Sequence, residues 1–105
     1  MYRHGDVLLI KIKELPNVKM KEKKSDILVE GEVTGHAHRI KGNAKIWEVA
    51  EEISNNDTGI IGYTVAEKGT SIVHEEHKEI KLPTGIYEVR RQREFDENHI
   101  RFIQD

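Results

Sequence analysis

Four of the six histidines in this chain stand in two closely spaced pairs. His36 and His38 belong to the stretch "GHAHR", and His74 and His77 belong to the stretch "HEEHK". Neutral imidazole is the commonest nitrogen ligand for transition metals in proteins. Both pairs are therefore candidate metal ligands.

The first pair fits a single ion if it lies on a β-strand. Alternate side chains of a strand project from the same face, which places the Cα atoms of His36 and His38 roughly 7 Å apart. Two imidazoles at that spacing can reach one ion without rearrangement of the backbone.

The second pair fits a single ion if the backbone turns where a strand ends. His74 and His77 then converge, and Glu75 or Glu76 between them can serve as a ligand, as an outer partner that orients a ligand, or as a general base. A common site for both pairs requires the two segments to meet in the fold. If they do not meet, the histidines are structural or exposed residues.

The chain contains no cysteine. Disulfides, thiolate nucleophiles and cysteine-type zinc sites are excluded, so a metal must be held by histidine, aspartate or glutamate. The cofactor that the histidines predict is a divalent transition metal, namely Zn, Fe, Mn, Ni or Co.

A second group of reactive side chains lies in "YEVRRQREF", residues 87–95. If Tyr87 and Val89 face the core, strand alternation places Arg91 and Arg93 on the same side. An arginine on an inward face is costly unless it meets a carboxylate or a bound anion.

Two interpretations of these arginines follow. Arg91 and Arg93 either pair with acidic side chains such as Glu32 or Glu75, or bind the phosphate or carboxylate of a substrate through bidentate contacts. Lys78, directly after the second histidine pair, is a further candidate for substrate binding.

Composition limits the remaining possibilities. A chain of 105 residues has room for one domain, residues 1–105. The net charge of -2 argues against coating nucleic acid by bulk charge. The N-terminal apolar run is too short for a signal peptide or a membrane span, which predicts a cytoplasmic protein without membrane contact.

The segments around these residues alternate in the manner of β-strands. Residues 6–13 form a strand in which Asp6, Leu8 and Ile10 share a face, and the same parity directs His4 to that side, toward the core or a cavity. Residues 27–42 suggest one long strand with a bulge or bend at its glycines.

Turn signals then predict hairpins. Residues 44–49 are expected to return as the partner of the long strand, although a helical stripe capped by Asn43 also fits, and residues 50–59 are expected to be a short helical turn or loop. "IIGYTV" and "TSIVHEE" flank "AEKG" as another hairpin. About seven short strands and at most one short helix predict an all-β fold, either a small β-barrel or a sandwich.

The stretches "GDVLLIKI", "GEVTGHAHRI" and "VHEEHKEIKLPTGIYEVRRQREF" resemble a family of small uncharacterised proteins of bacteria, archaea and their viruses, across most of the chain. The resemblance implies no activity. A more distant analogy is the cupin superfamily, which places H-x-H on a strand of a small barrel and holds a divalent metal. This chain departs from cupins because Gly42 and Asn43 stand where a glutamate is expected, and because its second histidine pair precedes the Pro-x-Gly turn.

The leading hypothesis is a metal-dependent enzyme that hydrolyses or isomerises a small anionic or phosphate-bearing substrate. Glu75 or Glu76 would act as acid or base and Arg93 would bind the substrate, while one ion would be held by His36, His38, His74 and His77.

Two other classes of function remain open. A metal-independent ribonuclease would use a histidine pair for acid and base catalysis on RNA, with Arg91, Arg93 or Lys78 stabilising the developing charge. A non-catalytic binding or adaptor module would use the histidines structurally. A homodimer is also expected, because small β domains often cover their strand edges by pairing.

Overall fold

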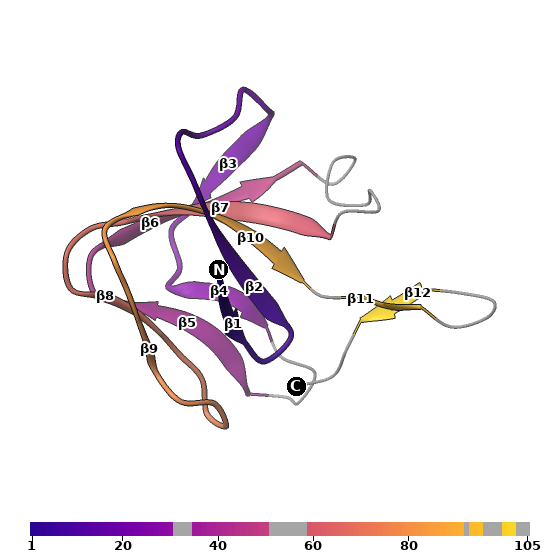
Figure 1. Cartoon of the computed structure of the whole chain (residues 1–105). Coiled ribbons are helices and arrows are strands. Elements are labelled where there is room, and N and C mark those ends of the chain that lie inside the picture. Colours follow the sequence, from indigo (N-terminus) through magenta and orange to yellow (C-terminus); the bar gives the residue numbers. More distant parts are fainter. Residues whose placement is uncertain (31–34, 51–58, 92, 96–99, 103–105) are drawn as a thin grey trace.

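The structure is a computed structural model that describes residues 1–30, 35–50 and 59–91 together with the backbone of residues 93–95 and 100–102. All regular elements in these residues are β-strands (Figure 1), which confirms the predicted all-β class. The described residues include no helix long and apolar enough to cross a bilayer.

The strands form two antiparallel sheets and a separate ribbon. The larger sheet has, in spatial order, β1 (Tyr2–His4), β2 (Val7–Ile12), β10 (Gly85–Arg91), β7 (Ile60–Ala66), β6 (Ala44–Val49) and β3 (Met20–Lys23). The smaller sheet has β4 (Ile27–Glu30), β5 (Ala37–Lys41), β8 (Thr70–Val73) and β9 (Ile80–Leu82). The ribbon pairs β11 (Arg93–Phe95) with β12 (Ile100–Phe102).

The two sheets enclose one apolar core as a sandwich and do not close into a barrel. The larger sheet contributes Val7, Leu9 and Tyr87 to this core, and the smaller sheet contributes Ile40 and Ile72. The two sheets hold ten described strands, which is more than the seven expected from the sequence.

Strand alternation holds along β10. Tyr87 and Val89 are buried, and Arg91 lies on their side of the strand, whereas Glu88 and Arg90 lie on the other side and pair with each other. The predicted parity of this segment is therefore confirmed for the residues up to Arg91.

Both hairpins that the turn signals predicted are wrong. β6 pairs with β3 and β7, and β8 pairs with β5 and β9, so neither strand pairs with the one that precedes it in the chain. Each of the two connections, β5 to β6 and β7 to β8, instead carries the chain from one sheet to the other.

The two connections form one corner of the sandwich. The amide of Glu67 and the hydroxyl of Thr70 both donate hydrogen bonds to the carbonyl of Asn43, at 2.9 and 2.8 Å. The β5–β8 pairing in the smaller sheet thereby continues as the β6–β7 pairing in the larger sheet. We call these four strands the corner ribbon.

Two other expectations require correction. Residues 27–42 are not one strand, because β4 and β5 pair antiparallel and the chain reverses between Glu30 and Ala37. The parity given to His4 is wrong as well, because a turn with Gly5 at φ 64° makes β1 and β2 a hairpin that places His4 opposite Val7. The predicted helical turn lies mostly in residues 51–58, outside the described residues.

Candidate metal centre

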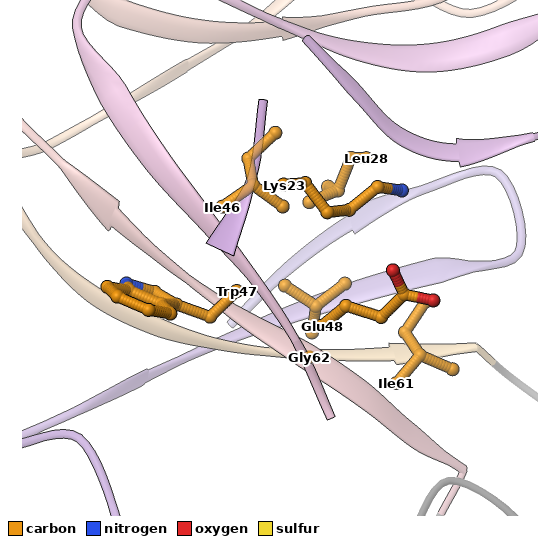
Figure 2. A pocket seen from close by; sticks show the side chains of 8 residues that line it. Lys23, Leu28, Ile46, Trp47, Glu48, Ile61 and Gly62 are labelled. Atoms are coloured by element: carbon orange, nitrogen blue, oxygen red, sulfur yellow. The ribbon is translucent and has the colours of Figure 1, made fainter. Parts of the chain in front are cut away.

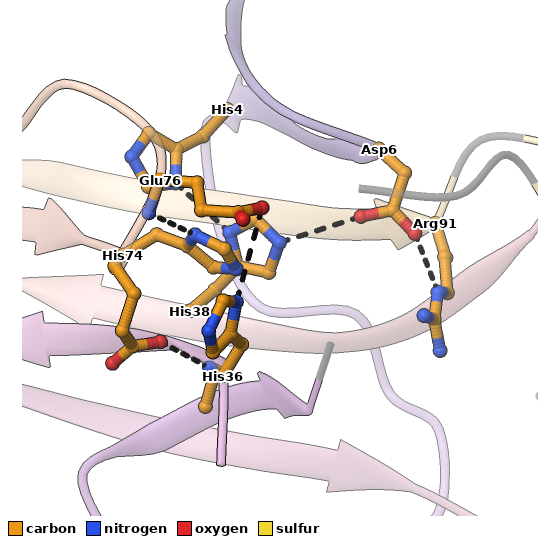
Figure 3. A network of polar contacts seen from close by, with 9 residues as sticks. His4, Asp6, His36, His38, His74, Glu76 and Arg91 are labelled. Carbon is orange, nitrogen blue, oxygen red and sulfur yellow. Dashed lines mark hydrogen bonds and ion pairs between the residues drawn. The ribbon is translucent and has the colours of Figure 1, made fainter. Parts of the chain in front are cut away.

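Four histidine rings pack together between the two sheets. All six ring-centroid distances among them lie between 4.4 and 6.2 Å, and the four residues are His4, His38, His74 and His77. A fifth ring, that of His36, lies 5.7 Å from the ring of His74. The two histidine pairs of the sequence therefore meet in the fold, and His4 joins them. Figure 3 shows His4, His36, His38 and His74 close together.

The register of the smaller sheet brings the two pairs together. Arg39 on β5 lies opposite Val73 on β8, so the next residues along this antiparallel pair, His38 and His74, are neighbours. His74 directly follows β8, and the bend before β9 turns His77 back, with its ring 4.6 Å from that of His74. The predicted convergence of His74 and His77 at a strand end is thus observed.

His4 reaches the cluster from the larger sheet. It ends the edge strand β1, and only 2% of its surface is exposed. Its Nδ1 lies 2.9 Å from Nδ1 of His38, and its Nε2 lies 2.9 Å from the carbonyl oxygen of Lys78. The sequence signal that would have placed it is the "HGDV" turn, which allows a tight hairpin.

Asp6 contacts the His38 ring at the nitrogen that does not face His4. It is 1% exposed, its Oδ1 lies 3.3 Å from Nε2 of His38, and its Oδ2 accepts a 2.7 Å hydrogen bond from Nε of Arg91. Arg91 thus meets an acidic partner, as one interpretation expected, and the described partner is Asp6. Glu32, one of the two expected partners, lies outside the described residues, and the described contacts of Glu75 are with Ala37 and Arg39. Figure 3 shows Asp6 between the His38 ring and the Arg91 guanidinium.

Glu75 ties the bend after β8 to β5. Its Oε1 accepts the amide of Ala37 at 2.7 Å, and its Oε2 accepts Nη1 of Arg39 at 3.0 Å. The hydrogen bond from Ala37 is the largest cause that lowers the pKa of Glu75, and the charge of Arg39 adds to it against an opposing effect of desolvation. Glu75 is therefore ionised at neutral pH.

Glu76 contacts His74 through its backbone and His36 through its side chain. Its amide donates a 2.9 Å hydrogen bond to Nδ1 of His74, and its Oε2 lies 3.8 Å from Nδ1 of His36. The side chain itself is exposed.

One set of side chains is spaced closely enough to share an ion. His36, His74 and Glu75 each offer one ligand atom, and these atoms all lie within 4.8 Å of one another. The rings of His38 and His77 lie next to this group on its buried side.

His4 is neutral at physiological pH. Burial is the largest cause, and together with the neighbouring rings of His38, His77 and His74 it lowers the pKa of His4 to about 4, despite the opposing hydrogen bond to Lys78. A neutral imidazole keeps the lone pair that a metal or a proton would take.

The remaining candidates for substrate binding are placed only in part. The side chain of Lys78 is exposed beside the cluster, while its carbonyl holds His4. Arg93 lies on β11, but its side chain is outside the described residues. Its contact with an anion stays a prediction.

A separate hollow of about 90 Å³ lies away from these side chains (Figure 2). None of the clustered histidines contributes to its wall, which is formed by Lys23, Leu28, Ile46, Trp47, Glu48, Ile61, Gly62 and Val89. The hollow is small, and we base no function on it.

Comparison with known protein families places the chain in a family for which no activity is described. Residues 3–92 match a family model described as Domain of unknown function (DUF8820), and the chain belongs to this family. No curated protein and no solved structure matches the chain. The membership agrees with the resemblance to an uncharacterised family, whereas the cupin comparison stays an analogy.

Proposed function

We propose that the protein is a metal-dependent enzyme that holds one divalent transition metal at the histidine cluster and hydrolyses a small anionic or phosphate-bearing substrate. The observation that carries the proposal is the convergence of five imidazoles from three separate segments of the chain. The cytoplasmic location expected from the sequence belongs to the same proposal.

The chemistry of the side chains supports a metal at this position. His36, His74 and Glu75 form a nitrogen and oxygen set suited to Zn, Fe, Mn, Ni or Co. Nδ1 of His36 is buried and has no hydrogen-bond partner among the described residues. A metal with an open position would supply a hydroxide nucleophile near neutral pH and would polarise a phosphoryl oxygen.

One contact must change when the ion binds. Nδ1 of His74 accepts the Glu76 amide, so the proton of the neutral His74 ring sits on Nε2. Ligation through Nδ1 displaces this amide, and ligation through Nε2 moves the ring proton to Nδ1 and breaks the same bond. We therefore expect metal binding to shift the bend from His74 to His77.

The first test measures metal directly. Protein purified without a histidine tag should bind about one equivalent of one of the five metals, as measured by elemental analysis and by calorimetric titration. Binding of none of them would overturn the proposal.

Two glutamates of the same segment provide a matched pair of variants. Glu75 offers a ligand atom, whereas Glu79 accepts a 2.7 Å hydrogen bond from the hydroxyl of Ser71 and is not part of the group. Glu75→Gln should lower metal affinity by roughly tenfold or more, and Glu79→Gln should leave it unchanged. Equal effects of the two variants would contradict a role for Glu75 as a ligand.

Activity is tested with chromogenic phosphate monoesters and diesters. Hydrolysis should be lost in the presence of a chelator and restored by one specific metal. Hydrolysis that does not respond to the chelator would contradict metal dependence.

A metal-independent ribonuclease is the second candidate, and one observation favours it. Asp6, His38 and His4 form a buried line of contacts, and neutral His4 can accept a proton. This candidate predicts cleavage of a short RNA in excess chelator, with a bell-shaped pH profile. No cleavage under those conditions would exclude it.

A further inference from the structure

The outer nitrogens of His4 and His38 both face groups that can only accept a hydrogen bond. Nε2 of His4 lies 2.9 Å from the carbonyl oxygen of Lys78, so this nitrogen carries the proton of the neutral ring. Nε2 of His38 lies 3.3 Å from Oδ1 of Asp6, and the other oxygen of this carboxylate accepts a 2.7 Å hydrogen bond from Nε of Arg91. A carboxylate can only accept, so the tautomer of His38 that suits this contact carries its proton on Nε2.

With both rings in these tautomers, the two inner nitrogens each carry a lone pair. Nδ1 of His4 and Nδ1 of His38 are 2.9 Å apart in a buried place. Two lone pairs at this distance repel unless a cation lies between them, and that cation is either a shared proton or a metal ion. Two imidazole nitrogens bound at about 2.0–2.1 Å and at a right angle around one ion are themselves about 2.9 Å apart.

We infer that His4 and His38 are metal ligands on the buried side of the cluster, that both bind through Nδ1, and that Asp6 is the positioning residue that fixes the ring proton of His38 on the opposite nitrogen. Histidine ligands in metal sites almost always donate their other N–H to a carboxylate or a backbone carbonyl. Asp6 and the carbonyl of Lys78 are such partners, one for each ring. The inference rests on the proposed function and adds His4, Asp6 and the ligating atoms to it.

The pair extends the proposed centre inward from the surface. The ring of His74 is 4.4 Å from that of His38 and 5.7 Å from that of His36, so it adjoins both the buried pair and the outer group. His74 is thereby the residue that connects the two sides of the centre.

The ligating atoms are identified by nuclear magnetic resonance. Protein labelled with ¹⁵N-histidine and loaded with ¹¹³Cd²⁺ should show one-bond coupling from cadmium to Nδ1 of both His4 and His38. Coupling to Nε2 of either ring, or no coupling to His4, would overturn the inference while leaving the proposed metal function intact. Failure to bind cadmium or any other tested metal would overturn both.

The role of Asp6 is tested by substitution. In Asp6→Asn the amide can donate to Nε2 of His38, which moves the ring proton to Nδ1 and blocks that nitrogen. We expect cadmium affinity to fall by roughly 10–100-fold and the coupling to Nδ1 of His38 to disappear. Unchanged affinity with the wild-type coupling pattern would refute the positioning role.

Adjacent arginines on β10 provide the control. Arg91→Gln removes the partner of Asp6 and should weaken cadmium binding, whereas Arg90→Gln removes a guanidinium that pairs with Glu88 on the opposite side of the strand and should not. If Asp6→Asn does not fold, the difference between these two variants decides the matter. Equal cadmium affinities of the two arginine variants would then count against the inference.

Discussion

His4 is a buried base surrounded by other imidazoles, and this position makes the stability of the metal-free protein depend on pH. Its pKa of about 4 in the folded protein lies below the ordinary value of 6.5, mainly because of burial and next because of His38. Between these two values the unfolded chain binds a proton that the folded chain does not. The contribution of neutral His4 to the free energy of unfolding is therefore fully present above pH 6.5 and is lost as the pH falls toward 4.

The expected loss at His4 is on the order of 3 kcal/mol over this range. Urea unfolding in the presence of a chelator, at several pH values between about 7 and 4.5, measures it. His4→Gln should show a shallower dependence by about one proton. Parallel curves for the two proteins would show that His4 does not titrate in this way.

At the scale of single residues, the two histidine pairs could be identified from the sequence, but their inner partners could not. His36, His38, His74 and His77 stand out by their spacing, which is local information. His4 and Asp6 could not be assigned, because a hairpin turn at Gly5 sets their direction and because their partners are separated from them by more than thirty residues.

Among the elements, the turn that leads into β5 depends on Gly35. Its φ of 86° is strained for any residue with a side chain, although no atom lies within 4 Å of the place that a Cβ would occupy. Gly69 has a φ of 88° and equally open surroundings, but it lies in the corner between β7 and β8. The two glycines therefore form a matched pair for substitution.

Gly35→Ala and Gly69→Ala should each destabilise the protein by about 1–2 kcal/mol, because alanine is forced into the left-handed region. Only Gly35→Ala should also weaken metal binding, since His36 follows directly. Chemical denaturation and metal titration of both variants test this. Equal metal affinities would indicate that the turn at Gly35 does not position His36.

The corner itself is sensitive to a single methyl group. A Cβ on Gly42 would meet the carbonyl oxygen of Gly69, and the φ of Gly42 is 106°. Gly42→Ala combines backbone strain with overpacking and should cost about 2–5 kcal/mol, more than Gly69→Ala. A Gly42→Ala protein as stable as Gly69→Ala in urea would mean that the two connections can move apart.

The strands that were predicted from alternating side chains are correct, whereas the strand pairings that were predicted from turn residues are wrong. Residues 44–49 form β6 within the predicted bounds, and the alternation of Tyr87 and Val89 is correct. The chain does bend at Gly42 and Asn43 and does turn at Lys68 and Gly69, but such residues specify local φ and ψ and not the strand that lies opposite. The corner depends on contacts between residues 43 and 70 that no local pattern contains.

For the whole molecule, the cluster is a place where the two sheets meet. His4 belongs to the larger sheet, while His38 and His74 belong to the smaller sheet or directly follow it. An ion bound by all three would connect the sheets. At a free metal concentration of about 100 times Kd, binding should stabilise the fold by about 2.7 kcal/mol.

Thermal unfolding with and without metal measures this stabilisation. The Tm should rise with metal concentration in the wild type and should rise much less in His4→Ala, which keeps only the ligands of the smaller sheet. An equal rise in both proteins would show that the ion does not connect the two sheets.

The corner ribbon has a consequence for cooperativity. Two of its strands belong to each sheet and the pairing continues from one sheet to the other, so we expect neither sheet to lose its pairing while the other keeps it. Unfolding is thus expected as a single all-or-none event, with the slowest amide exchange shared by β5, β6, β7 and β8. The edge strand β1 lies outside the corner ribbon, so its amides are expected to exchange faster than those of these four strands.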